Sequence, residues 1–226
     1  MAVSLYTSRV VLSVLGVDDF GLSVVITSVV AMFDFINHSM AVSTSRFFTY
    51  ELGKNDFEKL RKTFSASFTV HIIIAIIIII LCETIGLWYL ENKMIIPEGR
   101  MTAARWVYQL SLIGAFIAII QSPFDALIIS HEKMNVYAYI GILNSCLKLA
   151  IVYLLIFGNF DKLIFMQFLH YVLQLLLLCF IYVIASKNFK SVNIALNGIK
   201  QQYTRYYHFL VGICILLLVL IPKIKG

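Results

Sequence analysis

Residues 63–82 read TFSASFTVHIIIAIIIIILC and carry no formally charged side chain, and eight of the nine residues from 72 to 80 are isoleucine. Twenty helical residues extend over about 30 Å, which is the thickness of the hydrocarbon core of a bilayer. Inside that core only a helix or a closed barrel satisfies its own backbone hydrogen bonds. The sequence therefore predicts a membrane-spanning helix here.

The composition of the whole chain extends this prediction. Of its 226 residues, 61% are hydrophobic and only 13% are charged, and the mean hydropathy is +0.90. Such values exclude an ordinary soluble domain. We expect an all-α fold, a polytopic transmembrane bundle of six or seven helices. The four cysteines lie in apolar segments without CxxC spacing, so we expect small core residues rather than disulfides or a zinc site; they are Cys82, Cys146, Cys179 and Cys214.

The basic residues predict the orientation of the bundle. Five of them fall in residues 46–62, directly before the isoleucine-rich span, and the positive-inside rule places this loop in the cytoplasm. Predicted cytoplasmic loops carry ten Lys and Arg residues in all, against four in the predicted outer loops. The N-terminus is therefore expected inside, and topology explains the net charge of +6 better than nucleic-acid binding does. Within the loop, Asn55 is expected to cap a short amphipathic helix on the membrane surface.

Each later helix is expected to have one small or polar face. The predicted spans are residues 1–16, which lack the start of a full helix, then 22–43, 63–89, 105 to the turn at 130–135, 136–157 and 163–185. A helical wheel aligns small or polar residues on one face of four of these spans. On the second span they are Ser23, Thr27, Asp34, His38 and Ser45, and on the fourth span Ser111, Gly114, Ala118, Gln121 and Asp125. On the fifth span they are Gly141, Asn144, Ser145 and Lys148, and on the sixth span Gln167, His170 and Gln174. Such faces either pack helices in lipid or line a cavity.

Three stretches carry a resemblance to a known family: YTSRVVLSVLGVDDFG (6–21), SRFFTYELGKNDFEKLRKTFS (45–65) and HEKMNVYAYIGILNSCLKLAIVYLL (131–155). They resemble the N-terminal half of bacterial polysaccharide biosynthesis proteins. These are lipid-linked oligosaccharide flippases, for O-antigen or capsule, of the superfamily that also contains the multidrug exporters. The similarity covers roughly residues 4–185 and includes loops as well as apolar segments.

The resemblance implies a transporter of two pseudo-symmetric helical lobes around a cavity that opens alternately to each side. The implied cargo is undecaprenyl-pyrophosphate-linked oligosaccharide, and the implied location is the bacterial cytoplasmic (inner) membrane. Residues 1–190 would form one transmembrane lobe. Residues 191–226 would form a divergent tail with a short apolar segment at 209–221, which we expect a frameshift or early stop to have produced. The implied partners are the bilayer, the lipid-linked oligosaccharide, and a missing second lobe or glycan-assembly enzymes.

Arg9 is the first candidate for binding this cargo, because an arginine in an apolar helix is costly and a guanidinium holds a pyrophosphate with two parallel hydrogen bonds. Tyr6 and Ser13 share its face, and Tyr6 and Lys148 are the further candidates for binding the pyrophosphate. The structural alternatives are a salt bridge to Asp34 or another acid, or a side chain that reaches the membrane surface.

Seven further candidate residues lie in the predicted bundle. Asp34 and His38, one turn apart, either take up a coupling cation or form a structural pair. Asp125 and Lys148 are expected to be each other's partner, with a cavity role for Lys148 as the alternative. Gln121 and His170 are expected to line the cavity. Glu83 is expected to reach the outer interface.

The sequence contains no catalytic motif, and it implies no metal or cofactor: His131 and Glu132 begin a pattern like HExxH that Asn135 interrupts. Two functions other than a flippase stay open. One is a cation-coupled exporter of small amphiphilic molecules, which a cavity dominated by acids rather than arginine would favour. The other is an inert, truncated or scaffold-like membrane protein.

Overall fold

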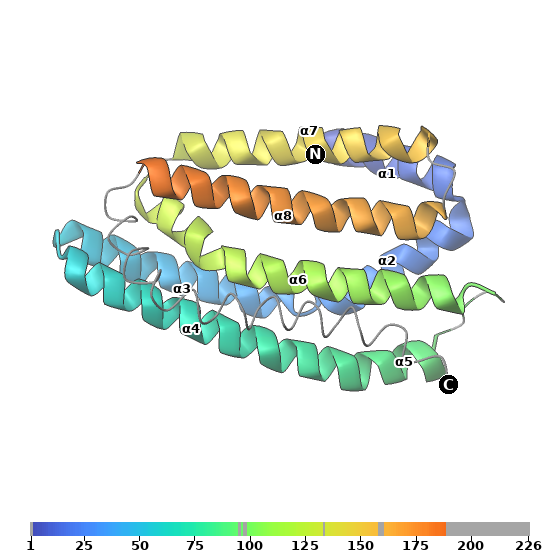
Figure 1. Cartoon of the computed structure of the whole chain (residues 1–226), viewed down its shortest axis with the longest axis horizontal. Helices are drawn as coiled ribbons and strands as arrows, with labels where there is room; N and C mark the ends of the chain where they lie inside the picture. Colours follow the sequence, from blue (N-terminus) through green and yellow to red (C-terminus); the bar gives the residue numbers. More distant parts are fainter. Residues whose placement is uncertain (1, 95, 97–98, 133, 158–160, 189–226) are drawn as a thin grey trace.

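The computed structural model describes residues 2–94, 96, 99–132, 134–157 and 161–188, and within them the fold is all-α (Figure 1). This confirms the predicted class. The elements are α1 (Ala2–Leu15), α2 (Val17–Ala31), α3 (Asp34–Gly53), α4 (Phe57–Leu81), the π-helical segment η1 (Cys82–Gly86), α5 (Leu87–Asn92), α6 (Met101–Ser130), α7 (Met134–Phe157) and α8 (Lys162–Asn188). Residues 191–226, including the apolar segment 209–221, lie outside the described residues.

The second predicted span is a bent pair of helices rather than one helix over 22–43. α2 and α3 meet at an angle of 44° at the break between Ala31 and Asp34. Asp34 therefore occupies the first turn of a new helix, where a carboxylate is favourable because the helix dipole is positive. Together the pair is much longer than predicted, because α3 continues through the basic loop as far as Gly53.

The loop 46–62 does not contain a separate surface helix. α4 begins at Phe57 and continues with η1 and α5 as one apolar span of 36 residues, from 57 to 92. Asp56, not Asn55, is the N-cap, and its Oδ1 accepts a hydrogen bond from the backbone N–H of Lys59 at 3.0 Å. Asn55 has a φ of 54°, a left-handed conformation that asparagine tolerates, and it forms the tight turn between α3 and α4.

The π-helical segment η1 is built against α6. The buried Tyr108 hydroxyl donates a 2.7 Å hydrogen bond to the backbone carbonyl of Cys82. Gly86 lies directly under the same hydroxyl, so that a Cβ there would collide with it. Glu83 points toward α6, where its Oε2 accepts from Gln109 Nε2 at 3.3 Å, and so the prediction that it reaches the outer interface is wrong.

α6 is the central helix of the bundle. It packs against α2, α3, α4 and α8, and two thirds of its most apolar 18-residue stretch is buried. A helix surrounded in this way is apolar on most sides, and its few polar positions are correspondingly informative. Its last part, which contains Pro123, turns away from the line of the rest of the helix (Figure 1), as expected where proline removes a backbone hydrogen bond.

The connections alternate between the two ends of the bundle. The α3–α4 and α6–α7 turns and the end of α8 lie at one end, and the α1–α2, α5–α6 and α7–α8 connections lie at the other (Figure 1). The first end holds the predicted cytoplasmic loops. The arrangement agrees with the predicted alternation of loops, and the side of the membrane on which each end lies stays a prediction.

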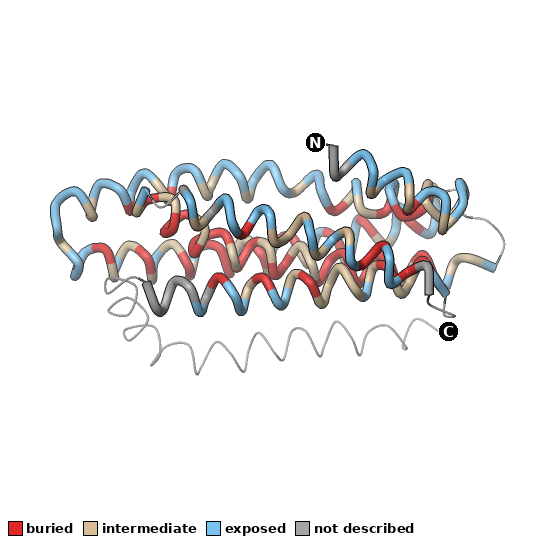
Figure 2. The backbone as a smooth tube through the Cα atoms, turned by 90° about the horizontal axis from the view of Figure 1, so that it is seen from above, coloured by how far each residue is buried: buried red, intermediate tan, exposed pale blue. Residues whose placement is uncertain are grey.

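Within the described residues, four helices are long and apolar enough to cross a membrane, or five if the bent pair α2–α3 forms one span; α1 is a shorter apolar helix. Buried residues gather on the inner sides of the helices and exposed residues on the outer sides (Figure 2). The outer sides carry many large apolar side chains, among them Phe35, Ile73, Ile142 and Leu176. By length and composition the chain is thus a multi-pass membrane protein.

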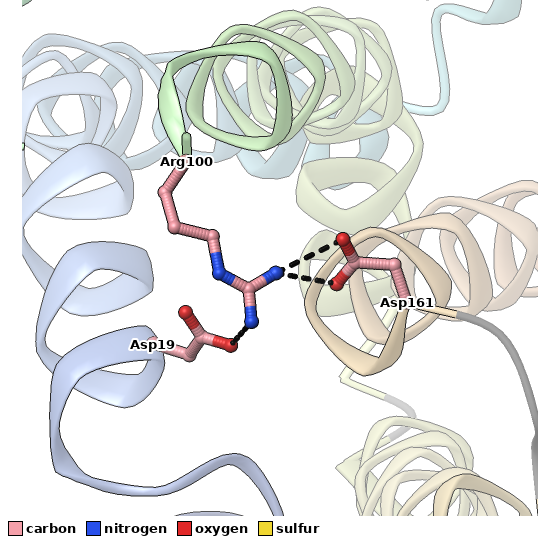
Figure 3. Close-up of polar contacts among 3 residues, drawn as sticks. All are labelled: Asp19, Arg100 and Asp161. Atoms are coloured by element: carbon pink, nitrogen blue, oxygen red, sulfur yellow. Dashed lines mark hydrogen bonds and ion pairs between the residues drawn. The ribbon is translucent and has the colours of Figure 1, made fainter. Parts of the chain in front are cut away.

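Arg100 holds three helices together at the predicted outer end (Figure 3). Its guanidinium lies 2.8 Å from Asp19 Oδ2 in the first turn of α2, and 3.0 Å from Asp161 Oδ2 directly before α8. A second ion pair of 2.7 Å joins Arg105 of α6 to Glu91 of α5. Planar guanidinium groups suit such shared contacts.

The cysteine prediction is only partly right. Cys82 is buried, whereas Cys146 and Cys179 are exposed and free, and Cys214 lies outside the described residues. An apolar segment of a membrane bundle faces lipid as readily as protein, and so hydropathy alone did not place these side chains inside.

Candidate functional site

A polar groove lies between α3, α6, α7 and α8. Its volume is about 580 Å³. The lining side chains are mostly small or polar: Asp34, Asn37, His38, Ala41, Ser45, Ala118, Gln121, Ser122, Asp125, Asn144, Lys148, His170 and Gln174, with five apolar residues from the same helices. The polar faces predicted from the helical wheels of these four helices therefore do meet in one place.

The groove has a half-buried floor and exposed walls. On the floor, α6 contributes Gln121 and Asp125, which are one turn apart and joined by a 3.2 Å hydrogen bond from Nε2 to Oδ2. On the walls, α3 contributes Asp34 and His38 and α7 contributes Lys148, and all three are exposed. Charged groups exposed on a membrane bundle face water, a cargo or another protein rather than lipid.

Two smaller cavities adjoin the groove. One of about 520 Å³ lies between α1, α2, α7 and α8, and it shares Lys148 and His170 with the groove. Another of about 180 Å³ lies between α2, α6 and α8, and it shares Asp34 and His170. His170 lines all three, so the polar interior continues from α3 to α1 past this one side chain.

The groove is not arginine-rich. Its ionisable lining residues are two aspartates, one lysine and two histidines. Asp125 and Lys148 form no ion pair, and so the prediction that they are partners is wrong. Asp125 instead takes the hydrogen bond from Gln121, which leaves the ammonium of Lys148 to the groove.

Several polar atoms of the groove have no hydrogen-bond partner among the described residues, although they are buried. They are Asn37 Oδ1, Gln121 Oε1, Ser122 Oγ, Asn144 Oδ1 and His170 Nδ1. Buried polar groups are nearly always satisfied, by protein, by ordered water or by a ligand. Carbonyl oxygens only accept, and so the groove matches molecules that offer hydrogen-bond donors.

Arg9 and Tyr6 lie outside the groove and the two adjoining cavities. Arg9 is exposed on α1 and forms no ion pair with Asp34 or with another acid among the described residues. The hydroxyl of Tyr6 lies 3.3 Å from that of Tyr153 on α7. The structure thus separates Arg9 and Tyr6 from the other candidates. It brings together Asp34, His38, Gln121, Asp125, Lys148 and His170. A role for Arg9 in binding stays a prediction.

Sequence reasoning missed Asn37 as a site residue. It lies one turn from Asp34 on α3 and lines the groove with it. The spacing of three residues was the available signal, because residues three apart share a helix face. No group of three or more His, Cys, Asp or Glu side chains suited to a metal ion occurs in the described part of the chain.

Comparison with known proteins adds no relative: no protein family, curated protein or solved structure matches the chain.

Proposed function

We propose that this chain is a transporter lobe that takes part in flipping undecaprenyl-pyrophosphate-linked oligosaccharide across the bacterial cytoplasmic membrane. The observation that carries the proposal is the polar groove between α3, α6, α7 and α8, in a bundle whose outer sides are apolar. A lipid-linked glycan has the matching division: its sugars are polar and its lipid tail is apolar.

The unsatisfied oxygens of the groove support a sugar as the bound part. The hydroxyls of a sugar donate hydrogen bonds, and Asn37, Gln121 and Asn144 each present a buried carbonyl oxygen without a partner. Asp34 and Asp125 add carboxylates, which make stronger charge-assisted bonds to the same donors. Hydrogen bonds to such charged groups contribute about 1.5–3 kcal/mol each.

Lys148 is the groove residue best suited to the pyrophosphate. It is the one lysine of the groove, it is exposed there, and it has no carboxylate partner among the described residues. An ammonium binds phosphate as a point charge, without the two-pronged geometry of arginine. Lys148 thus takes the position that the sequence alone favoured for Arg9.

A second candidate function is export of small cationic amphiphiles. The observation in its favour is that, among the described residues, acidic groups and carbonyl oxygens outnumber the one lysine in the groove, and no arginine lines it. Organic amines also donate hydrogen bonds, and they are attracted to Asp34 and Asp125. The two functions differ in the charged residue that binds the cargo: Lys148 would bind a pyrophosphate, whereas Asp34 and Asp125 would bind an organic cation.

Binding to the intact chain in lipid nanodiscs tests these alternatives. Undecaprenyl-pyrophosphate-linked oligosaccharide, added at about 100 times its Kd, should raise the free energy of unfolding by about 2.7 kcal/mol. Lys148→Ala should weaken this binding by about 1.5–3 kcal/mol, since it removes a hydrogen-bonding cation. The matched control is Lys162→Ala, which removes an exposed lysine at the start of α8, outside the groove.

The same assay with a lipophilic cation separates the second function. If the chain exports cationic amphiphiles, Asp125→Asn should weaken binding of the cation and Lys148→Ala should not. If neither ligand stabilises the chain, or if Lys162→Ala is as harmful to glycan binding as Lys148→Ala, the proposed function is wrong.

A further inference from the structure

A second polar contact lies outside the groove, between η1 and α6. Gln109 of α6 is 1% exposed, and its Nε2 donates to Glu83 Oε2 at 3.3 Å. The π-helical turn presents Glu83 to α6, and the surrounding buried groups are Cys82 and Tyr108, whose hydroxyl already donates to the backbone. A carboxyl group thus faces a neutral amide inside a membrane bundle.

The charged groups around Glu83 do not neutralise it. On α6, Arg105 lies one turn before Gln109, and its guanidinium is committed to Glu91 at 2.7 Å. On the continuation of its own helix, Glu91 lies two turns further along and is held in that same ion pair. No ion pair involves Glu83 within the described residues.

Two oxygen atoms of this contact are left without partners. Glu83 Oε1 and Gln109 Oε1 are both buried, and neither makes a hydrogen bond within the described part of the chain. An ionised carboxylate only accepts hydrogen bonds, and so it cannot serve the amide oxygen. An acid that keeps its proton has a hydroxyl to donate.

We propose that Glu83 and Gln109 form a proton-binding site, in which Glu83 is a neutral carboxylic acid paired reciprocally with the amide. The amide N–H donates to Oε2 of the acid, and the acid O–H on Oε1 donates to Oε1 of the amide. One proton therefore satisfies both unpartnered oxygens. The ionised alternative leaves a charge on a half-buried side chain without a counter-ion, which is costly inside a bundle.

If Glu83 is protonated, a glutamine at position 83 reproduces its shape, its hydrogen-bond donor and its hydrogen-bond acceptor. Glu83→Gln replaces the acid O–H by an amide N–H that donates to the same oxygen of Gln109, with nearly the same shape. It should unfold at the same denaturant concentration as the wild-type chain. Gln109→Leu should unfold at a lower one, because it removes both hydrogen bonds and leaves the Glu83 carboxyl without a partner.

Infrared spectroscopy of the full chain in lipid, at about pH 7.5 where an ordinary glutamate is ionised, observes the proton directly. The wild-type minus Glu83→Gln difference spectrum should contain the carbonyl stretch of a protonated carboxylic acid. The matched control is Glu91→Gln, which removes an ion-paired glutamate of the same span and should remove a carboxylate band instead.

Loss of a carboxylate band in Glu83→Gln would overturn the proposal, because it would mean that Glu83 is ionised at this pH. A Glu83→Gln chain that fails to fold, or unfolds at a clearly lower denaturant concentration, would also overturn it, because the amide would then not replace the acid. These outcomes are independent of glycan binding in the groove.

Discussion

Gly86→Ala should destabilise the bundle through a single contact, that with Tyr108. A Cβ at position 86 would collide with the Tyr108 hydroxyl, and it would lie 3.1 Å from the ring carbon Cζ. The hydroxyl cannot simply move, because it is buried and donates a 2.7 Å hydrogen bond to the carbonyl of Cys82. Overpacking of this kind costs about 1–3 kcal/mol, and loss of the hydrogen bond leaves the carbonyl unsatisfied at a similar cost.

Tyr108→Phe separates the two contributions. Alone it should cost about 1–3 kcal/mol, since it removes the donor to a buried carbonyl. It also removes the atom that the new Cβ would strike, and what remains is the 3.1 Å contact to Cζ, which a shift of a few tenths of an ångström relieves. The double variant should therefore be more stable than the sum of the single effects predicts, by at least about 1 kcal/mol.

The assay is reversible unfolding of the four chains in mixed micelles, combined as a double-mutant cycle. Gly114→Ala on α6 is the control for adding a methyl group to a helix glycine, because a Cβ there meets nothing within 4 Å. Strictly additive effects of the Gly86 and Tyr108 substitutions would show that a Cβ at position 86 does not strike the Tyr108 hydroxyl. So would a Gly86→Ala chain as stable as the Gly114→Ala control.

Three other predictions concern residues at the helix ends. Arg100→Gln should lower stability by about 1 kcal/mol at low salt and by less at high salt, in denaturant unfolding, because it breaks a half-exposed bridge between α2 and α8. The Lys59 N–H bound to Asp56 holds the pKa of that carboxyl below its ordinary value, so its stabilisation is present above the unfolded-state pKa and is lost as the pH falls through the folded-state pKa. Asp56→Asn should remove this part of the pH dependence of unfolding between neutral pH and about pH 3. In a cysteine-free background, an impermeant thiol reagent outside intact cells should label cysteine at position 92 and not at 55; labelling at 55 would overturn the predicted topology.

Much of the fold follows from the sequence because a bilayer allows only helices or closed barrels to span it. The charge-free residues 63–82 lie inside the long helix from 57 to 92, and the turns at the predicted cytoplasmic positions lie at one end of the bundle. The errors are local. The break before Asp34 and the π-helical turn at Cys82–Gly86 depend on how neighbouring helices pack, and hydropathy does not record that packing.

The candidate site was predictable in its polar residues and not in its pairings. Helical wheels placed Asp34, Asp125, Lys148 and His170 on inward faces, and all four line the groove. They did not show that Asp125 bonds to Gln121 rather than to Lys148, because that depends on the spacing between helices. The position of Glu83 was predicted wrongly for a similar reason: five residues before Trp88 it could reach the interface, and the π-helical turn directs it to Gln109 instead.

The central claim is that the groove is a cargo site accessible from water within the membrane. Its most direct test is the reaction of a water-soluble thiol reagent with the cysteine-free chain in nanodiscs, carrying Gln121→Cys on the groove floor or Leu176→Cys on an exposed apolar side of α8. We expect Gln121→Cys to react and Leu176→Cys not to react, and we expect undecaprenyl-pyrophosphate-linked oligosaccharide to slow the reaction of Gln121→Cys. If Gln121→Cys were as unreactive as Leu176→Cys, or if it reacted equally fast with the glycan bound, the claim would be contradicted.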